Sequence, residues 1–243
     1  MATLYHYCTT NTFAAIVRER SIRLSSLNLS NDTMEGRLAS HILREMVSAR
    51  GGGLEAFSRI KEIMEYVERI LHGFGFCLSS EGDLLSQWRG YADDAHGVSI
   101  GFDQDAMANL GGAELSAVSY TREEQETMLS PLVDDVLSNA EESALLDKVL
   151  ELLDKMFLMK SPAFAEEKEW RLITSSSLGV GGWDVCPRRS SLVPFRELGI
   201  NDGVITQVVL GPKHQTPVDV VQRSLLKWGF NGVTVVRSKA TYR

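Results

Sequence analysis

The chain has 243 residues, of which 44% are hydrophobic, and its formal net charge is −7 at pH 7. This length allows one large domain or two small ones, and the apolar fraction is ordinary for a globular protein with a sizeable core. The acidic balance, with a sequence pI of about 5.3, argues against bulk electrostatic binding of nucleic acid or of an anionic membrane. It leaves room for a local basic site.

The cysteines and the N-terminus indicate the compartment. Cys8, Cys77 and Cys186 are scattered and form no CxxC pair, which favours a reducing compartment without a disulfide framework. The first residues show no basic segment followed by an apolar one, and no apolar run reaches the ~20 residues that a membrane span needs. We therefore expect a soluble, cytoplasmic protein without a membrane partner; the oligomeric state cannot be predicted.

The first part of the chain alternates short strands and helices. The pattern predicts a strand over residues 4–8, a helix capped near Thr9 and running to residue 20, and a second strand at 22–24. A polar segment at 27–35 is rich in turn-forming residues. Residues 38–72 then have helical periodicity, interrupted at Gly51–Gly53. A buried strand at 74–78 and a short helix at 84–91 follow.

The second part contains the longest helical pattern, at 131–159, after strands predicted at 98–102 and 115–120. A strand over 165–173, a glycine-rich loop near Gly179–Gly182, a strand at 204–210, a helix at 218–228 and a last strand at 232–236 complete the chain. Strands and helices are mixed without regular alternation, which favours an α+β fold. No linker or internal repeat is visible, so we expect a single domain over 1–243 with helical insertions near 38–72 and 131–159.

The most informative segment is Ala165–Ile173, which contains two carboxylates and a guanidinium. Side chains alternate along a strand, so Glu167, Glu169 and Arg171 are expected on one face. Neighbouring carboxylates raise each other's pKa, and a nearby cation opposes that rise. Such a group of charges is typical of a ligand site and also of a solvated strand face.

Other motifs favour structural roles when they are considered singly. Gly97-Val98-Ser99-Ile100-Gly101 matches the GxSxG pattern, but the apolar alternation runs through Ser99, which indicates a strand residue rather than a nucleophile at a strand–helix turn. His6 on a strand is more often a half-buried histidine than a ligand contact. Trp88 and Tyr91, three residues apart on a helix, are more often core residues than a stacking platform.

Two further segments do not decide between a structural and a functional role. Asn31 and Asp32 with Glu35 fit an Asx turn that caps a helix and, with equal weight, a polar loop over a cleft. The region around Gly179 has no dinucleotide-binding or P-loop pattern. The five histidines show no metal-binding spacing, so no metal site is predicted.

The order of these motifs resembles that of a known family. They are, in chain order, Leu4-Tyr5-His6-Tyr7-Cys8-Thr9, Asn31-Asp32-Thr33-Met34-Glu35, Phe76-Cys77-Leu78-Ser79, Gln87-Trp88-Arg89-Gly90-Tyr91, His96-Gly97-Val98-Ser99-Ile100-Gly101-Phe102, Tyr120, Lys160 and Glu167-Lys168-Glu169-Trp170-Arg171. The chain is similar over most of its length, from about Leu4 to near Leu210, to a large bacterial family of unknown function with HYT, NDPxE, CFS, WxxYAxxHxG and ExExR motifs. Thr33 departs from that pattern, which has proline there.

That family is grouped with the ADP-ribosyltransferase-like superfamily. The resemblance implies a split, mostly antiparallel β-sandwich around a cleft for NAD, which is the co-substrate. Three stations follow from it: His6 on the first strand, Ser79 on a middle strand and Glu169 on a late strand, with Glu167 as the first residue of an E-x-E pair. It also implies an uncharacterised bacterial protein, with a toxin or phage-defence role.

Chemistry gives each of these residues an expected role. Cleavage of the nicotinamide–ribose bond develops positive charge on the ribose, which Glu169 is expected to stabilise. Glu167 is expected to orient or deprotonate the acceptor. The remaining candidates are His6, Tyr7, Ser79, Trp88, Tyr91 and Arg171 for NAD, and Asn31, Asp32, Glu35 and His96 for the substrate.

The expected activity is mono-ADP-ribosyl transfer to an unknown acceptor (protein, nucleic acid or small molecule) or NAD hydrolysis. The alternative is an inactive nucleotide-binding or protein-interaction module. The cheapest discriminator is whether His6, Ser79 and Glu169 converge on one cleft. Glu169→Ala is expected to leave folding intact, because a strand carboxylate that faces a cleft contributes little to the core.

Overall fold

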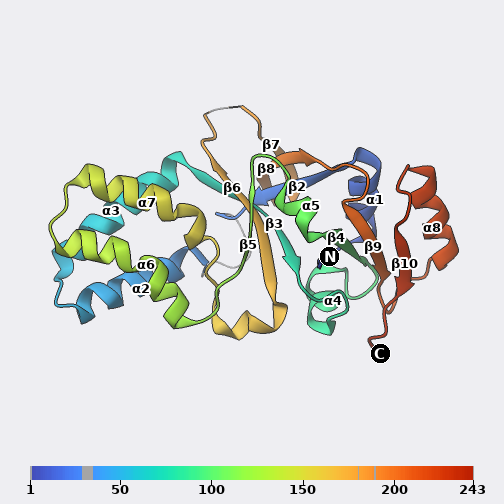
Figure 1. The fold of residues 1–243 in the computed structure, drawn as a ribbon, viewed down its shortest axis with the longest axis horizontal. Coiled ribbons are helices and arrows are strands. Elements are labelled where there is room, and N and C mark those ends of the chain that lie inside the picture. The colour runs from blue at the N-terminus through green and yellow to red at the C-terminus, as the bar shows by residue number, and fades with distance from the viewer. Residues whose placement is uncertain (1, 29–34, 180, 189, 243) are drawn as a thin grey trace.

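The computed structural model describes residues 2–28, 35–179, 181–188 and 190–242, and within them the fold is α+β (Figure 1). Ten strands form one large sheet of mostly antiparallel pairs, with helices around it. The elements are β1 (Thr3–Cys8), α1 (Thr10–Glu19), β2 (Ser21–Ser26), α2 (Glu35–Ala49), α3 (Leu54–Ile70), β3 (His72–Ser79), α4 (Leu85–Tyr91), β4 (Val98–Asp103), α5 (Gln104–Ala108), β5 (Glu114–Ala117), α6 (Arg122–Leu137), α7 (Glu142–Met156), the 3₁₀ helix η1 (Pro162–Glu167), β6 (Glu169–Ser176), β7 (Asp184–Arg188), β8 (Ser191–Gly199), β9 (Ile205–Leu210), α8 (Val218–Lys227) and β10 (Thr234–Arg237).

The sheet divides at β3. The main order is β10-β9-β4-β1-β3-β2-β8-β7, and β6, which itself pairs with β5, runs along the whole of β3. β1 meets β3 at Tyr5 opposite Ser79, whereas β2 meets β3 near the other end, at Ser25 opposite Gly75 and Ser26 opposite Phe74. β1 and β2 therefore diverge from one edge of β3. The pairs are antiparallel except for β9 with β10, which is parallel.

The two faces of the central strands have different chemistry. We call the face that carries Leu24, Phe74, Phe76 and Leu172 the core face, because these side chains belong to the main hydrophobic core together with residues of α1, α5 and α8. The opposite face carries Ser79, Glu169 and Arg171, and we call it the charged face. Strand alternation and the register of β3 against β6 fix this division, since Phe76 lies opposite Leu172 and Ser79 opposite Glu169.

Helices α2, α3, α6 and α7 pack together beside the sheet as a helical unit with its own apolar core (Figure 1). The interruption predicted at Gly51–Gly53 is present, and Gly51 has the positive φ of +81° that favours glycine. The predicted helix over 131–159 is two helices, because Asn139 turns the chain with a φ of +58°. The first of them begins earlier than predicted, at Arg122, and contains Pro131.

Two elements differ from the sequence prediction. The hairpin of β7 and β8 lies where no strand was predicted; its side chains are largely exposed in β7, so the apolar alternation that reveals a half-buried strand is missing there. Glu167 does not lie in a strand. Pro162 starts the 3₁₀ helix η1, Ser161 caps it, and Lys168 ends it with a φ of +46° before β6 begins at Glu169.

Candidate functional site

Two acidic and two basic side chains form a compact group on the charged face, the charged cluster of Lys160, Glu167, Glu169 and Arg171. Lys160 Nζ donates to Glu167 Oε2 at 2.6 Å and to Glu169 Oε2 at 2.9 Å. Arg171 Nε donates to Glu169 Oε1 at 2.7 Å, and its Nη2 donates to Glu169 Oε2 at 3.1 Å. Both oxygens of Glu169 are thus bound by cations. Each of the four residues is at most 9% exposed.

Several separate elements position the charged cluster. Glu169 and Arg171 stand two residues apart on β6 and so share a face, whereas Glu167 comes from the end of η1. Lys160 lies in the connection that follows α7, where its backbone amide donates to the Ser119 carbonyl at 3.0 Å. A buried glutamine of α6, Gln125, donates to the carbonyls of Ser119 and Lys160, at 2.9 Å each.

Three hydroxyl groups surround the carboxylates. Tyr91, at the end of α4, donates to Glu167 Oε1 at 3.1 Å. The hydroxyl of Tyr120 accepts from the backbone N–H of Glu169 at 2.9 Å. Ser79 donates to the backbone carbonyl of Glu167 at 2.7 Å. Ser79 therefore holds the chain that carries Glu167, rather than a carboxylate oxygen.

The electrostatics of the cluster keep its charges fixed. Burial alone would raise the pKa of Glu169, but Arg171, and then Lys160, overcome it and lower that pKa to about 2. Burial lowers the pKa of Lys160, but Glu169 and Glu167 outweigh it and leave the pKa above its ordinary value. Burial and the neighbouring Glu167 raise the pKa of Tyr91. At neutral pH Glu169 is therefore an anion, Lys160 a cation and Tyr91 a neutral donor.

The cluster meets solvent at an aromatic edge. The side chain of Glu167 is 12% exposed, against 7% for Glu169 and 6% for Lys160. Tyr91, which contacts Glu167, is 51% exposed, and Phe164, whose ring centroid lies 4.9 Å from Lys160 Nζ, is 37% exposed. Glu167 is therefore the carboxylate of the pair that a ligand would reach first.

His6 does not join this group. Tyr5 is paired with Ser79, so the next residue, His6, projects from the core face, opposite to Ser79 and Glu169. Its ring stacks on Phe76, with centroids 4.1 Å apart, and Nδ1 bonds the Cys77 carbonyl at 2.8 Å. Burial lowers its pKa to about 4, so it is neutral. His6 therefore does not converge with Ser79 and Glu169 on one face, and by this criterion the expected NAD site of these three residues is weakened; His6 instead connects β1 to β3.

Tyr7 and Trp88 lie on the charged face but are covered. Trp88 is 0% and Tyr7 5% exposed, and their rings meet edge to face with centroids 4.9 Å apart. Trp88 Nε1 donates to Asp83 at 2.7 Å, and the Tyr7 hydroxyl donates to the Glu81 carbonyl at 2.8 Å. Neither ring has a free face for stacking here, so the expected contact with nicotinamide has no support from this geometry.

The remaining predicted residues are not assembled with the cluster. Asn31 and Asp32 lie outside the described residues, and Glu35 is described only as the first residue of α2. His96 is exposed in the turn between α4 and β4, where its Nδ1 donates to the Asp93 carbonyl at 2.9 Å. Its relation to a substrate stays a prediction.

The prediction from sequence missed the roles of Lys160 and Tyr120. Both were noted only for their order along the chain, because neither belongs to a local motif with Glu169. The signal that the sequence does contain is a lysine at the end of a long helical pattern, shortly before an E-x-E-x-R segment. Only the fold brings this ammonium between the two carboxylates.

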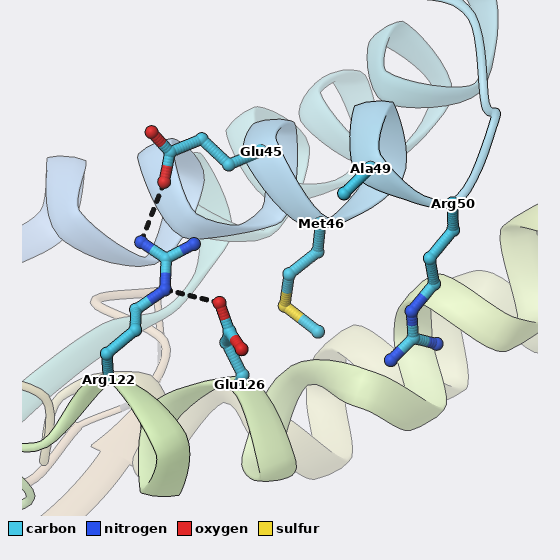
Figure 2. Close-up of a pocket in the computed structure, with 6 residues that line it drawn as sticks. All are labelled: Glu45, Met46, Ala49, Arg50, Arg122 and Glu126. Atoms are coloured by element: carbon cyan, nitrogen blue, oxygen red, sulfur yellow. Dashed lines mark hydrogen bonds and ion pairs between the residues drawn. The ribbon is translucent and has the colours of Figure 1, made fainter.

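A separate hollow lies between α2 and α6, with a volume of about 190 Å³ (Figure 2). Figure 2 shows Met46 directed into it and Arg122 bonded to two carboxylates; the distances are 2.7 Å to Glu45 and 2.5 Å to Glu126. Arg50, at the other end, pairs with Asp134 at 2.5 Å. Both guanidinium groups are therefore satisfied by the protein, and no predicted site residue lines the hollow.

Neither a metal site nor a membrane span emerges from the described residues. Among them, no group of three or more His, Cys, Asp or Glu side chains is placed to hold a metal ion. No helix within the described ranges is both long and apolar enough to cross a membrane.

Comparison with known proteins gives one partial match. Residues 87–172 match the family described as "Protein of unknown function (DUF2971)", a stretch that runs from α4 to β6 and covers less than half of the chain. It includes Lys160, Glu167, Glu169 and Arg171. Searches of curated proteins and of solved structures find no match.

Proposed function

We propose that this protein is an NAD-consuming enzyme of the ADP-ribosyltransferase-like kind, which cleaves the nicotinamide–ribose bond and passes ADP-ribose to an acceptor or to water. One observation carries the proposal: a buried, ionised Glu169 is held rigidly beside a second carboxylate, Glu167. The divided, mostly antiparallel sheet is compatible with the split sandwich of that superfamily.

The properties of Glu169 suit an electrostatic role. When the nicotinamide–ribose bond breaks, positive charge grows on the ribose, and a fixed negative charge in a dry site stabilises it without reorganisation. A carboxyl group with a pKa of about 2 stays ionised but is a weak base. Glu169 therefore stabilises charge, and Arg171 and Lys160 hold its orientation.

Glu167 takes the second role. Its side chain is the more exposed of the two carboxylates and reaches Tyr91 at the aromatic edge. In this position it orients or deprotonates an acceptor that arrives from solvent. Ser79 and Tyr120 are positioning residues, because they bond the backbone at Glu167 and Glu169. His6 has no catalytic part in this proposal, since it lies on the other face.

The test is nicotinamide release from NAD by the purified protein, followed by chromatography with and without cell lysate as a source of acceptor. The variants are Glu169→Gln and Glu167→Gln. The matched control is Glu81→Gln, which removes a nearby carboxylate whose pair with Lys168 is solvent-exposed. We expect wild type and Glu81→Gln to release nicotinamide at equal rates, and Glu169→Gln to release it about 10²–10³-fold more slowly.

The stability of each variant has to be measured together with its rate of nicotinamide release. Glu169→Gln leaves two buried cations with less compensation, so thermal unfolding and near-ultraviolet circular dichroism must establish that the variant is folded at the assay temperature. Glu167→Gln should reduce transfer to an acceptor more than hydrolysis. Absence of nicotinamide release by folded wild type, with and without lysate, would refute the proposal.

A second candidate function is a binding module without turnover, and a specific observation favours it. Both oxygens of Glu169 are occupied, and the cluster ties α6, η1 and β6 together, as a structural cross-link would. In that case wild type leaves NAD intact, and Lys160→Met and Glu169→Gln lower the unfolding temperature by comparable amounts.

A further inference from the structure

Asp83 links two separate parts of the chain at the point where β3 leads into α4. Its Oδ1 accepts from Trp88 Nε1, on α4, at 2.7 Å, and from Ser238 Oγ at 2.5 Å. Its Oδ2 accepts from the backbone N–H of Lys239 at 2.7 Å. Burial would raise the pKa of Asp83, but these hydrogen bonds outweigh it and lower that pKa. The carboxylate is therefore ionised at neutral pH, and it ties α4 to the segment that follows β10.

That segment, residues 238–242, is called the strap here. It forms neither helix nor strand and lies beside α4 (Figure 1). Ala240 and Tyr242 pack against the small apolar cluster that contains Tyr7 and Trp88. The strap is thus one of the elements that cover Trp88, which is 0% exposed although it belongs to a helix at the surface.

The strap is also held beyond the other end of α4. The Tyr242 hydroxyl donates to Asp94 Oδ1. Lys213 Nζ donates to Asp94 Oδ2 at 2.9 Å, and it lies 3.8 Å from the centroid of the Tyr242 ring. Asp83 precedes α4 and Asp94 follows it, so the strap is bonded to the chain on both sides of this helix.

α4 needs support of this kind because it is short and leads into a strained turn. It has seven residues, no side chain caps its N-terminal end among the described residues, and isolated helices shorter than ~12–15 residues are marginal. Asp93, Asp94 and Ala95 then have φ values of +50°, +50° and +71°, a left-handed conformation that costs free energy for residues other than glycine. The Ala95 N–H donates to the Trp88 carbonyl at 3.0 Å, which joins the turn to α4. Contacts from outside therefore have to hold both.

The same helix carries Tyr91 to the charged cluster. Tyr91 stands three residues after Trp88, and its hydroxyl donates to Glu167 Oε1 at 3.1 Å. Glu167 Oε2 is bonded separately, by Lys160 Nζ at 2.6 Å. The direction of the Glu167 carboxylate thus depends on Lys160 at one oxygen and on the position of α4 at the other.

We propose that the strap holds α4 in place, and that Asp83 is the positioning residue through which it keeps the Tyr91 hydroxyl on Glu167. The placement of Tyr91 is a property of the fold alone. The effect on catalysis rests on the function proposed above, because Glu167 orients an acceptor well only while its own carboxylate is fixed. Glu169 keeps its bonds to both cations when the strap loosens, so hydrolysis of NAD should continue while transfer declines.

The first experiment measures the position of Tyr91 and needs no NAD. Asp83→Asn places an NH₂ group against the Lys239 N–H, and Ser238→Ala removes one donor of the strap. The readouts are amide hydrogen exchange and the NMR signals of ¹³C-labelled tyrosine rings, with Tyr91 assigned through Tyr91→Phe. We expect exchange in α4 to be about tenfold faster in Asp83→Asn and severalfold faster in Ser238→Ala, because hydrogen bonds to charged groups are the strong ones. The Tyr91 signal should shift in both variants, while exchange in β3 and β6 should not change.

The matched control is Lys239→Gln, because Lys239 contacts Asp83 through its backbone N–H and its side chain is exposed. It should match wild type in the exchange of α4 and in the Tyr91 signal. Unchanged exchange in α4 and an unchanged Tyr91 signal in both Asp83→Asn and Ser238→Ala would overturn the proposal. An effect of Lys239→Gln equal to that of Ser238→Ala would overturn it as well.

The second experiment measures the ratio of transfer to hydrolysis with ³²P-labelled NAD, as label bound to the macromolecules of a cell lysate against free ADP-ribose. We expect the ratio to fall severalfold in Asp83→Asn and Ser238→Ala and to stay unchanged in Lys239→Gln. A constant ratio while the Tyr91 signal moves, or hydrolysis without any transfer by wild type, would overturn the catalytic part of the proposal. If wild type leaves NAD intact, the proposed function fails, and the exchange of α4 and the Tyr91 signal still decide whether the strap holds this helix.

Discussion

The helical unit and the charged cluster bury their side chains on different principles. The core of the helical unit is apolar throughout the described residues, and its packing rests on side chains such as Ile60 and Leu132, both 0% exposed. The charged cluster buries four ionised groups of the sheet region and compensates each with an opposite charge at hydrogen-bonding distance. Gln125 connects the two regions.

The two regions are expected to respond differently to substitution and to pH. An apolar core loses stability in proportion to the volume that is removed, and it is indifferent to pH. A buried charge network depends on every partner, because removal of one leaves another charge uncompensated. Replacement of such a network by apolar residues is often neutral for stability, and perturbed pKa values cluster at functional sites, which makes the cluster the better place to look for function.

Glu169→Ala tests the comparison with the largest expected effect. It removes the carboxylate that Arg171 and Lys160 both contact, and we expect a loss of about 3–5 kcal/mol in the free energy of unfolding. Urea denaturation measures it, and Glu81→Ala, on the exposed pair with Lys168, should cost at most ~1 kcal/mol. A loss of less than about 1 kcal/mol for Glu169→Ala would contradict the role of the cluster as a cross-link. It would agree instead with the expectation from the sequence that this substitution leaves folding intact.

The pH dependence of stability sharpens the contrast. The pKa of Glu169 falls from 4.5 to about 2 on folding. The stabilisation is therefore fully present above pH ~4.5 and is lost as the pH falls toward 2, by about 3 kcal/mol from this group. Unfolding curves between pH 2 and 7 should show this slope for wild type and a shallower one for Glu169→Gln, which carries no titrating group there. Parallel curves for the two proteins would contradict the assignment.

The smallest expected effect comes from the helical unit. Ile60→Val removes one buried methylene from α3, and we expect a loss of about 0.5–1.5 kcal/mol. The loss should be the same at pH 4 and pH 7, since no charge is involved, and nicotinamide release should not change. Denaturation at both pH values checks this; a pH-dependent loss would mean that the two regions are coupled more tightly than Gln125 suggests.

Local patterns were sufficient for much of the fold. The capped helix after β1, the interruption at Gly51–Gly53 and the strand at Ser99 follow from spacing and turn residues, because each depends on a few neighbouring positions. The β7–β8 hairpin does not follow from such patterns, because the side chains of β7 are nearly all exposed and show no apolar alternation. The 3₁₀ helix that Pro162 starts and Lys168 ends replaces the first residues of the predicted 165–173 strand, because its backbone geometry leaves no mark on the apolar periodicity.

The sequence by itself determined that Glu169 and Arg171 share a strand face, that this face is charged, and that the helical segments bury apolar stripes. These are properties of neighbouring residues and of the fixed periods of strand and helix. Only the tertiary structure decided that Lys160 lies between the two carboxylates, and that His6 lies on the other face. Those relations depend on which strands pair and in which register, and pairing is set by the packing of the whole chain.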